Sequence, residues 1–305
     1  MRNSFTVKVP ASTSNLGAGF DCFGLALQLY LTVRARVMPL GAAACQVRSV
    51  GANAGLPRGT DNLIYGVMSH VARSEGRTLP PVRLAVHNEI PLGGGLGSSA
   101  AAIVAGVKLA GAVCGQSLSE AAVLRYAAEM EGHPDNAAAS VRGGFVVNAV
   151  ATDGAIVSVR QDWPADLKVI VVSPHAFLAT HEARAVLPQT VSRADAVFNL
   201  QRAALFSAAL ATRSYDVLRE AMRDALHQNY RRFLLPGLAE ALDLKPQPGL
   251  CGVALSGAGP AVLALATENF TALGQSIADC FARQGQEASV RLLEVANIGA
   301  QMRGK

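Results

Sequence analysis

Alternating apolar and polar positions predict several β-strands in the first half of the chain. Residues 5–9 alternate and end at Pro10, residues 30–37 alternate from their second position onwards, and residues 82–86 alternate more briefly. A period of two turns successive side chains to opposite faces of a strand, so that one face can be buried. The pattern therefore predicts a β-rich beginning.

Helical spacing then replaces the alternation and predicts two consecutive helices. The first begins at Ser98 or Ser99, either of which is an acceptable N-cap, and ends near Gly115. The second begins at a capping-box pattern, Ser117 with Glu120 three residues later, and the next Gly-His-Pro sequence ends it.

Strand-like and helical stretches alternate along the rest of the chain. A turn-rich patch around Asp153 and Gly154 predicts a boundary between two domains, residues 1–154 and 155–305. Strands and helices in both halves indicate an α+β or α/β layer in each. The predicted elements are strands at 145–150, 168–172, 253–255, 261–266 and 289–294, and helices at 194–212, 215–227 and 270–283.

Charge narrows the class of partner. The 305 residues carry a formal net charge of +5, which would be compatible with nucleic-acid binding. Nucleic-acid binders gather Lys and Arg on one stripe, whereas here the basic residues are scattered and Arg231-Arg232 is the only adjacent pair. A mild positive field suits nucleotides and carboxylates equally well. We therefore expect small-molecule partners and no nucleic acid.

Cysteines and apolar segments indicate a cytoplasmic protein. The five cysteines form no Cys-x-x-Cys pair, which disfavours a zinc knuckle or a thioredoxin-type site. The N-terminus has no apolar core of the kind that a signal peptide needs, and the most apolar stretch, residues 100–113, is too short to span a bilayer. We expect no membrane partner.

A glycine-rich segment is the strongest candidate for a ligand site. Its glycines allow the backbone to approach a ligand closely, and the helix that follows presents free N–H groups and partial positive charge at its N-terminus. This arrangement suits a triphosphate. The candidate residues are Pro91, Leu92, Gly93, Gly94, Gly95, Leu96, Gly97, Ser98, Ser99, Ala100 and Ala101.

Three other interpretations of this segment compete with a triphosphate site. A Walker A loop is excluded because no lysine follows Gly97. A dinucleotide fingerprint is matched by Gly95, Gly97 and Ala100, but it requires a strand next, and here a helix is predicted. A glycine turn that only packs against a helix of small residues remains open.

Two further glycine-bearing blocks change the balance. One is the polar turn after the first strand, residues 9–21, and the other is the Ser-Gly-Ala-Gly-Pro loop within residues 255–261. Together with the central loop they resemble the three motifs of the GHMP kinase superfamily. The resemblance implies an α+β fold of two domains, an N-terminal ribosomal S5-like domain that binds ATP and a C-terminal ferredoxin-like domain, with the active site between them.

Within that superfamily the chain is most similar to the homoserine kinase family, over nearly its whole length. One departure is Ala18, where the family usually has proline. The matching segments are residues 10–17, 19–21, 131–136, 180–184, 230–231 and 235–237.

The resemblance implies ATP-dependent phosphorylation of the hydroxyl of L-homoserine, in threonine biosynthesis. It assigns Mg²⁺ to Ser98 and Glu131, and catalysis to these two residues with Asp21. A carboxylate such as Glu131 at a helix C-terminus opposes the helix dipole, and a cation there would offset that cost. Asn62 resembles a residue near adenine. The substrate would be held by Asn15, Asp21, His133, Asp135, Asn136, Thr180, Arg184 and Arg231.

Other functions remain open at this point. Another small-molecule kinase of the superfamily, acting on mevalonate or a sugar, would share the loops, and a non-catalytic nucleotide-binding relative would share the fold. Arg184 and Arg231 favour an acceptor with a carboxylate, because neutral sugars need no cationic clamp. The expected partners are homoserine and ATP, and a homodimer is compatible with the sequence.

Overall fold

The computed structural model describes residues 3–52 and 55–304. It contains two sheets, a seven-stranded one and a four-stranded one. The strands are β1 (Ser4–Asn15), β2 (Gly19–Val37), β3 (Cys45–Gly51), β4 (Val82–Asn88), β5 (Phe145–Val150), β6 (Ile156–Gln161), β7 (Lys168–Pro174), β8 (Leu250–Leu255), β9 (Val262–Ala266), β10 (Ala288–Leu293) and β11 (Gln301–Gly304). The helices are α1 (Leu63–Ser74), α2 (Ser98–Val113), α3 (Glu120–Glu131), α4 (Asp135–Arg142), α5 (Thr180–Ala185), α6 (Arg193–Thr212), the 3₁₀ turn η1 (Tyr215–Val217), α7 (Leu218–Ala221), α8 (Gln228–Arg231), α9 (Leu238–Leu242) and α10 (Phe270–Ala282).

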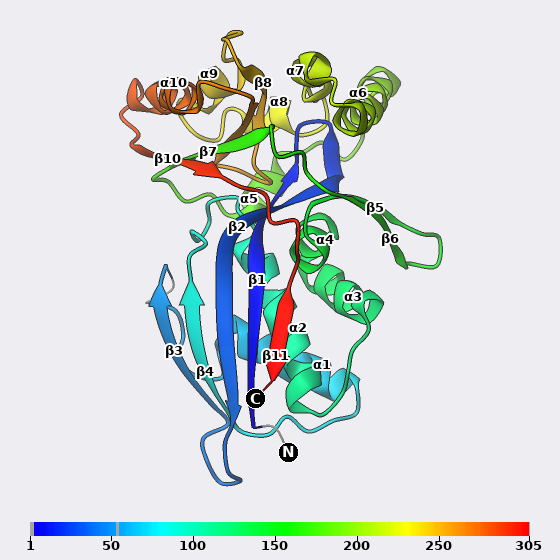
Figure 1. The fold of residues 1–305 in the computed structure, drawn as a ribbon, viewed down its shortest axis with the longest axis vertical. Helices are drawn as coiled ribbons and strands as arrows, with labels where there is room; N and C mark the ends of the chain where they lie inside the picture. The colour runs from blue at the N-terminus through cyan, green and yellow to red at the C-terminus, as the bar shows by residue number, and fades with distance from the viewer. Residues whose placement is uncertain (1–2, 53–54, 305) are drawn as a thin grey trace.

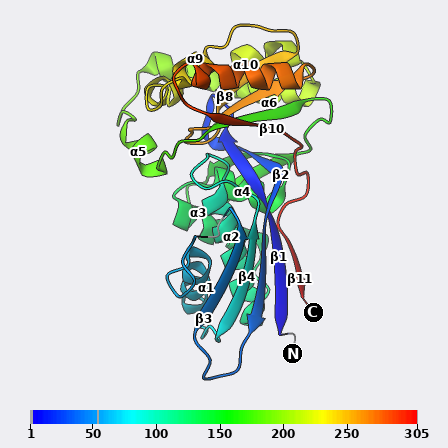
Figure 2. The ribbon, with the colours of Figure 1, turned by 90° about the vertical axis from the view of Figure 1, so that its left-hand side faces the viewer.

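The larger sheet has the order β11-β1-β2-β4-β3, and the β5–β6 hairpin pairs with β2. The long strands β1 and β2 run from the end that holds both termini into the other half of the molecule (Figure 1). Helices α1, α2 and α3 lie on one side of this sheet (Figure 2). Helix α2 is buried on most of its circumference, and at Gly106 it approaches α1 so closely that a Cβ atom would lie 2.7 Å from Val67. Small residues therefore allow this helix to lie deep in the core.

The smaller sheet is antiparallel, with the order β10-β7-β9-β8. If the four strands are numbered 1 to 4 in chain order, from β7 to β10, their order across the sheet is 4-1-3-2. Helices lie between β7 and β8 and between β9 and β10, which is the arrangement of a ferredoxin-like domain. Val169 and Val171 of β7 pack toward the larger core, while Ile170 and Val172 pack toward α9 and α10. Burial on both faces explains why β7 is continuously apolar. The predicted two-domain α+β fold is confirmed.

No single point in the sequence separates the strands of the larger sheet from those of the smaller sheet. The hairpin strand β6 and the terminal strand β11 both belong to the larger sheet. The division into residues 1–154 and 155–305 therefore stays a prediction, to be tested by whether each segment folds when expressed alone.

Local details of several predicted elements were wrong. Strand β1 does not end at Pro10 but continues to Asn15, because a register shift after Pro10 accommodates the missing N–H. The cap of α3 is Ser119, whose side chain accepts a hydrogen bond from Ala122, and not a capping box with Ser117. The helix predicted at 215–227 is broken into η1 and α7.

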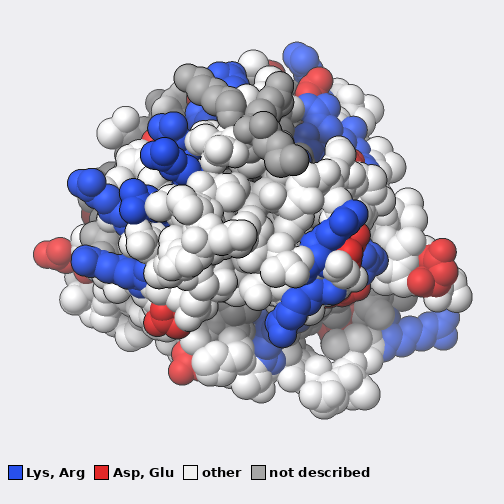
Figure 3. Space-filling model, turned by 90° about the horizontal axis from the view of Figure 1, so that it is seen from below, with Lys and Arg blue, Asp and Glu red and all other residues white. Residues whose placement is uncertain are grey.

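None of the helices in the described part of the chain combines the length and apolar character that crossing a membrane requires. On the face seen in Figure 3, Lys and Arg side chains form separate groups, with acidic and uncharged side chains between them. The described residues on this face form no continuous basic stripe of the kind that tracks a nucleic-acid backbone.

Candidate active site

A cavity of about 700 Å³, counting its open mouth, is lined by residues from both halves of the chain. The three glycine-bearing blocks meet there, together with the start of α4 and helices α5 and α8. The residues predicted for the site that line it are Asn15, Asp21, Pro91, Gly93, Gly94, Gly95, Leu96, Gly97, Ser98, Ser99, Ala100, Glu131, His133, Asp135, Asn136, Thr180, Arg184 and Arg231.

One end of the cavity is built from backbone. Helix α2 begins at Ser98, and its N-cap is Gly97 in the left-handed conformation with φ 66°, so neither Ser98 nor Ser99 is the cap that the sequence predicts. No side chain of the described residues caps this helix. The first N–H groups of α2 are therefore free to donate hydrogen bonds to a ligand, and the helix dipole favours an anion at this position.

The glycine loop is held against the third glycine block. Gly95 has φ +71°, and a Cβ atom there would lie 2.3 Å from the backbone oxygen of Ser256. The hydroxyl of Ser256 donates a 2.6 Å hydrogen bond to the backbone oxygen of Gly95. Contact between two backbones, together with a positive φ, explains why glycine is needed here.

The polar turn between β1 and β2 has an unusual backbone. Asn15, Leu16 and Asp21 have positive φ values of 73°, 47° and 53°. The Asn15 side chain donates to the Gly257 backbone oxygen at 3.0 Å and accepts from the Asp21 N–H at 3.1 Å. Such conformations cost about 1–3 kcal/mol each and persist where the surroundings enforce them, often at functional sites.

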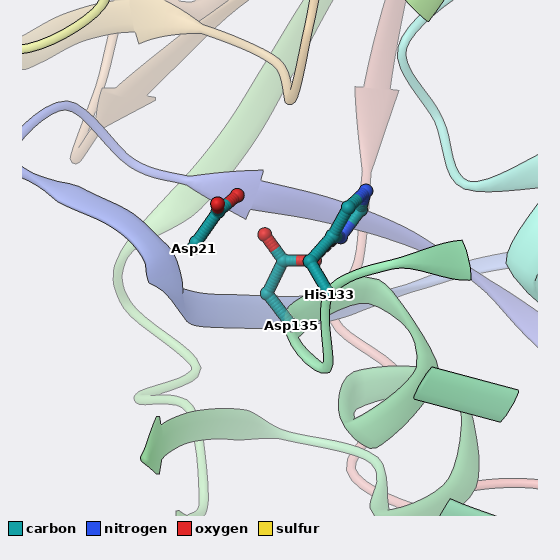
Figure 4. Close-up of side chains that lie close together, drawn as sticks. All are labelled: Asp21, His133 and Asp135. Atoms are coloured by element: carbon teal, nitrogen blue, oxygen red, sulfur yellow. Dashed lines mark hydrogen bonds and ion pairs between the residues drawn. The ribbon is translucent and has the colours of Figure 1, made fainter. Parts of the chain in front are cut away.

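Asp21 projects from this turn toward His133 and Asp135 (Figure 4). Ligand atoms of these three residues lie within 4.8 Å of one another. Arg184 forms two hydrogen bonds with Asp21, at 2.7 and 3.2 Å. Because Arg184 already neutralises Asp21, the trio does not need a metal ion to balance its charge.

The segment between α3 and α4 supplies the neighbouring acid–base groups. Asp135 accepts hydrogen bonds from Nδ1 of His133 at 2.5 Å and from the Asn136 N–H at 2.6 Å. Burial lowers the pKa of His133, but the hydrogen bond and the charge of Asp135 outweigh it, so that this pKa lies above its ordinary value. The Asn136 side chain bonds to Ser12 and Ser14 and ties α4 to β1.

Glu131 is the carboxylate best placed for a cation. Its Oε1 atom is buried and has no hydrogen-bond partner among the described residues, while Oε2 lies 3.9 Å from Nε2 of His133. An unpartnered buried carboxylate oxygen is costly unless a cation approaches it. Glu131 and the hydroxyl of Ser98 line the same cavity, and hard oxygen donors are the ligands that Mg²⁺ prefers. The donor set therefore fits this ion.

Two arginines line the cavity. Arg231 is 2% exposed, and its Nε donates to the backbone oxygen of Ala183 at 2.9 Å, next to Arg184. Burial and the charge of Arg184 lower the pKa of Arg231 to about 10, so that it stays charged at neutral pH. The ring of Phe20 lies 5.4 Å from the Arg231 guanidinium and 5.7 Å from that of Arg184.

Three predicted cofactor residues do not line the cavity. Asn62 is the N-cap of α1: its side chain accepts a hydrogen bond from the Ile64 N–H and donates one to the Pro57 oxygen. Leu92 is exposed, and Ala101 is fully buried in α2. Lining residues that the sequence analysis did not select are Ser14, Phe20, Leu178, Gly257, Ala258 and Gly259. All of these except Leu178 lie inside the glycine-bearing blocks at residues 9–21 and 255–261, and that position was the available signal.

Comparison with known proteins agrees with this geometry. The GHMP kinases N terminal domain matches residues 62–144, and the GHMP kinases C terminal domain matches residues 206–274. The chain is 43% identical to the homoserine kinase of Solibacter usitatus, covering 98% of this chain and 97% of that protein. It is 40% identical to the homoserine kinase of Aquifex aeolicus, covering 97% and 98%.

A solved structure gives the same result. The homoserine kinase from Cytophaga hutchinsonii superimposes with a TM-score of 0.85 at 26% identity, covering 99% of this chain and 98% of that one. Full-length similarity of this degree, with the three loops gathered around one cavity, shows that the chain belongs to the homoserine kinase family of the GHMP kinases.

Proposed function

We propose that the protein transfers the γ-phosphoryl group of ATP to the hydroxyl of L-homoserine, giving O-phospho-L-homoserine for threonine biosynthesis. The observation that carries this proposal is that one cavity contains two different kinds of binding surface, one of backbone donors and one of charged side chains. A backbone cradle at the N-terminus of α2 suits phosphates, and the adjoining arginine and carboxylate groups suit a zwitterionic amino acid.

The glycine loop and the first turn of α2 would hold the phosphates of ATP. Gly93, Gly95 and Gly97 all have positive φ, which turns successive stretches of backbone toward the cavity without side chains in the way. The residues proposed for this role are Pro91 to Ala101, and Asn62, at the start of α1, is proposed to lie near the adenine of ATP.

The amino-acid end would bind homoserine by exchanging ion pairs. In the described structure Arg184 is paired with Asp21 at 2.7 Å. The carboxylate of a bound homoserine would form ion pairs with Arg184 and Arg231. The ion pair between Arg184 and Asp21 would then break, and Asp21 would face the hydroxyl of the substrate. Asn15, His133, Asp135, Asn136 and Thr180 would complete the pocket for the ammonium group and the chain.

Asp21 is the proposed proton acceptor. Phosphoryl transfer has a loose transition state, so positioning and charge stabilisation can carry most of the catalysis, and a strong base is not required. Asp21 needs only to orient the hydroxyl and take its proton late in the reaction. Its positive φ and its bond to Asn15 fix the carboxylate in this place.

Glu131 and Ser98 are the proposed ligands of Mg²⁺. When bound, the ion would neutralise negative charge on the phosphate oxygens. The unpartnered Oε1 atom of Glu131 supports this assignment. The homodimer that the sequence leaves open stays a prediction.

A coupled assay of ADP release tests the proposed function. The purified protein is offered L-homoserine, L-serine, mevalonate and galactose at equal concentrations, with ATP and Mg²⁺. We expect the highest kcat/KM for L-homoserine. Serine lacks one methylene, so its hydroxyl would fall short of the phosphoryl group. A higher value for mevalonate or galactose would overturn the proposal in favour of another GHMP kinase.

A further inference from the structure

His227 lies directly behind the cavity wall that carries Arg231, and its side chain is fully buried. It touches two parts of the site without lining the cavity. Its Nε2 atom is 2.9 Å from the backbone oxygen of Gly17, in the turn that presents Asp21. Its Nδ1 atom is 3.3 Å from Nη1 of Arg231, and its ring stacks on Phe20 at 5.1 Å.

These two contacts define the protonation state of His227. A backbone carbonyl only accepts a hydrogen bond, and a guanidinium only donates, so Nε2 carries the proton and Nδ1 accepts. A second proton would set two donors against each other and place two cations in contact. Burial lowers the pKa of His227, and the charge of Arg231 acts in the same direction, against that of Asp224. The neutral ring therefore persists at neutral pH.

Arg231 has only one nitrogen free for a substrate. Its Nε is held by the Ala183 oxygen, and Nη1 is held by His227 and, at 3.4 Å, by the Gly257 oxygen. Among the residues that the structure describes, none accepts a hydrogen bond from Nη2. A guanidinium anchored on two nitrogens presents its third in one direction, so that Nη2 can donate to a carboxylate oxygen from a fixed position.

The loop before α8 is built to hold His227 in place. The carboxylate of Asp224 is buried and accepts hydrogen bonds from the N–H groups of Leu226, His227 and Gln228, at 3.1, 2.8 and 2.6 Å. The Asn199 side chain donates to the same carboxylate and also to the oxygen of Ala18. His227 therefore has a fixed backbone on one side and the substrate turn on the other.

We propose that His227 is a positioning residue, which accepts a hydrogen bond from Nη1 of Arg231 and thereby directs Nη2 at the carboxylate of the acceptor. The proposal rests on the proposed homoserine kinase function. It adds a specificity-determining residue that never touches the substrate. His227 also joins the turn of Asp21 to Arg231, so one neutral ring sets the position of both groups.

Two substitutions separate the two hydrogen bonds of His227. In His227→Gln the amide nitrogen can occupy the position of Nε2 and keep the bond to Gly17, but no acceptor faces Arg231. In His227→Asn the amide oxygen can occupy the position of Nδ1 and keep the bond to Arg231. We expect the KM for homoserine to rise roughly tenfold in the Gln variant and to be largely restored in the Asn variant, since a bond to a charged group is lost only in the first.

Three controls make this comparison specific. The KM for ATP should stay within about twofold in both variants, because the phosphate cradle is independent of His227. With 3-aminopropan-1-ol, which is homoserine without its carboxylate, the Gln variant should match the wild type in kcat/KM. His87→Gln, at an exposed position of β4, should behave as the wild type with every substrate.

Equal losses in the Gln and Asn variants, or an equal loss with the carboxylate-free acceptor, would overturn the role of His227. Imidazole nitrogen NMR of the labelled wild-type protein adds a test that needs no variant. We expect the neutral Nε2–H tautomer at neutral pH, and a protonated ring or the other tautomer there would also overturn the proposal. Failure of the wild type to phosphorylate homoserine would instead contradict the proposed function. The tautomer measurement would still test the hydrogen bonds of His227 with Gly17 and Arg231.

Discussion

The two ends of the cavity are built in different ways. The phosphate end consists of one continuous segment, in which glycine backbone and the uncapped start of α2 provide the donors. The amino-acid end is assembled from side chains of β1, β2, the α3–α4 connection, α4, α5 and α8, which meet only in the folded chain. Backbone donors recognise any polyphosphate, whereas a set of paired charges recognises one arrangement of carboxylate, ammonium and hydroxyl.

This difference shows where the family can change its acceptor. A change of acceptor requires only new side chains at the second end, while the first end must keep its backbone. The first end should therefore respond to an added Cβ atom, and the second to a lost charge. Substitutions at each end can test these two sensitivities separately.

The largest effect is expected where the two ends meet, at Glu131. Glu131→Gln keeps the shape of the side chain but removes the charge that a hard cation prefers. We expect kcat to fall on the order of 10²-fold or more, and the Mg²⁺ concentration needed for half-maximal rate to rise. A magnesium titration of the ADP-release rate measures both.

Glu129→Gln is the matched control, because Glu129 lies on the same helix with its side chain 51% exposed and paired with Arg125. It should behave as the wild type. A titration of Glu131→Gln that superimposes on the wild-type curve would remove the metal role from Glu131 and assign the ion to other donors.

A smaller effect is expected from the charge at the amino-acid end. Arg184→Leu removes one partner of the proposed carboxylate clamp, and bonds of this type contribute about 1.5–3 kcal/mol. The KM for homoserine should rise roughly ten- to a hundredfold, while the KM for ATP stays unchanged. Steady-state kinetics with each substrate varied in turn measure the two values.

Arg223→Leu serves as the control for Arg184→Leu, since Arg223 is exposed and paired with Glu220 outside this cavity. Arg184→Lys should fall between the two, because the charge remains but the two-bond geometry is lost. If Arg184→Leu raised the KM for ATP as much as that for homoserine, the separation between the two ends would be wrong.

The same division explains what could be predicted from the sequence. The phosphate end is contiguous, so its glycines and the start of α2 were recognised directly. The amino-acid end was identified only through the family resemblance, because Asp21, Arg184 and Arg231 are far apart in sequence. Helices α5 and α8 are too short to show a periodic pattern.

The errors in the fold have local physical causes. The helix predicted at 215–227 fails because the Asp224 carboxylate captures three N–H groups and starts α8 instead. Helix α1 is absent from the predicted elements, although its N-cap Asn62 and the helical spacing of its apolar positions Ile64, Val67, Met68 and Val71 are visible in the sequence. Here the signal for a helix was present in the sequence but was missed.

The smallest effect, and the most specific one, is expected from a single methyl group at the phosphate end. In Gly95→Ala the new Cβ would lie 2.3 Å from the Ser256 oxygen, so the loop must shift. That shift displaces backbone donors, and we expect the KM for ATP to rise about five- to tenfold, with the KM for homoserine unchanged. The residue also has φ +71°, which by itself costs an alanine roughly 1–2 kcal/mol of stability.

Gly115→Ala separates the methyl contact from the backbone strain. Gly115, just past the far end of α2, has nearly the same φ, +72°, but a Cβ atom there would meet no described atom within 4 Å beyond its own chain neighbours. Both variants should therefore lose a similar amount of stability through φ in thermal unfolding, whereas only Gly95→Ala should bind ATP more weakly. Equal KM values for ATP in the two variants would mean that the close contact between the glycine loop and Ser256 does not position the phosphate donors. The phosphate end would then tolerate an added side chain, and the proposed difference between the two ends of the cavity would be wrong.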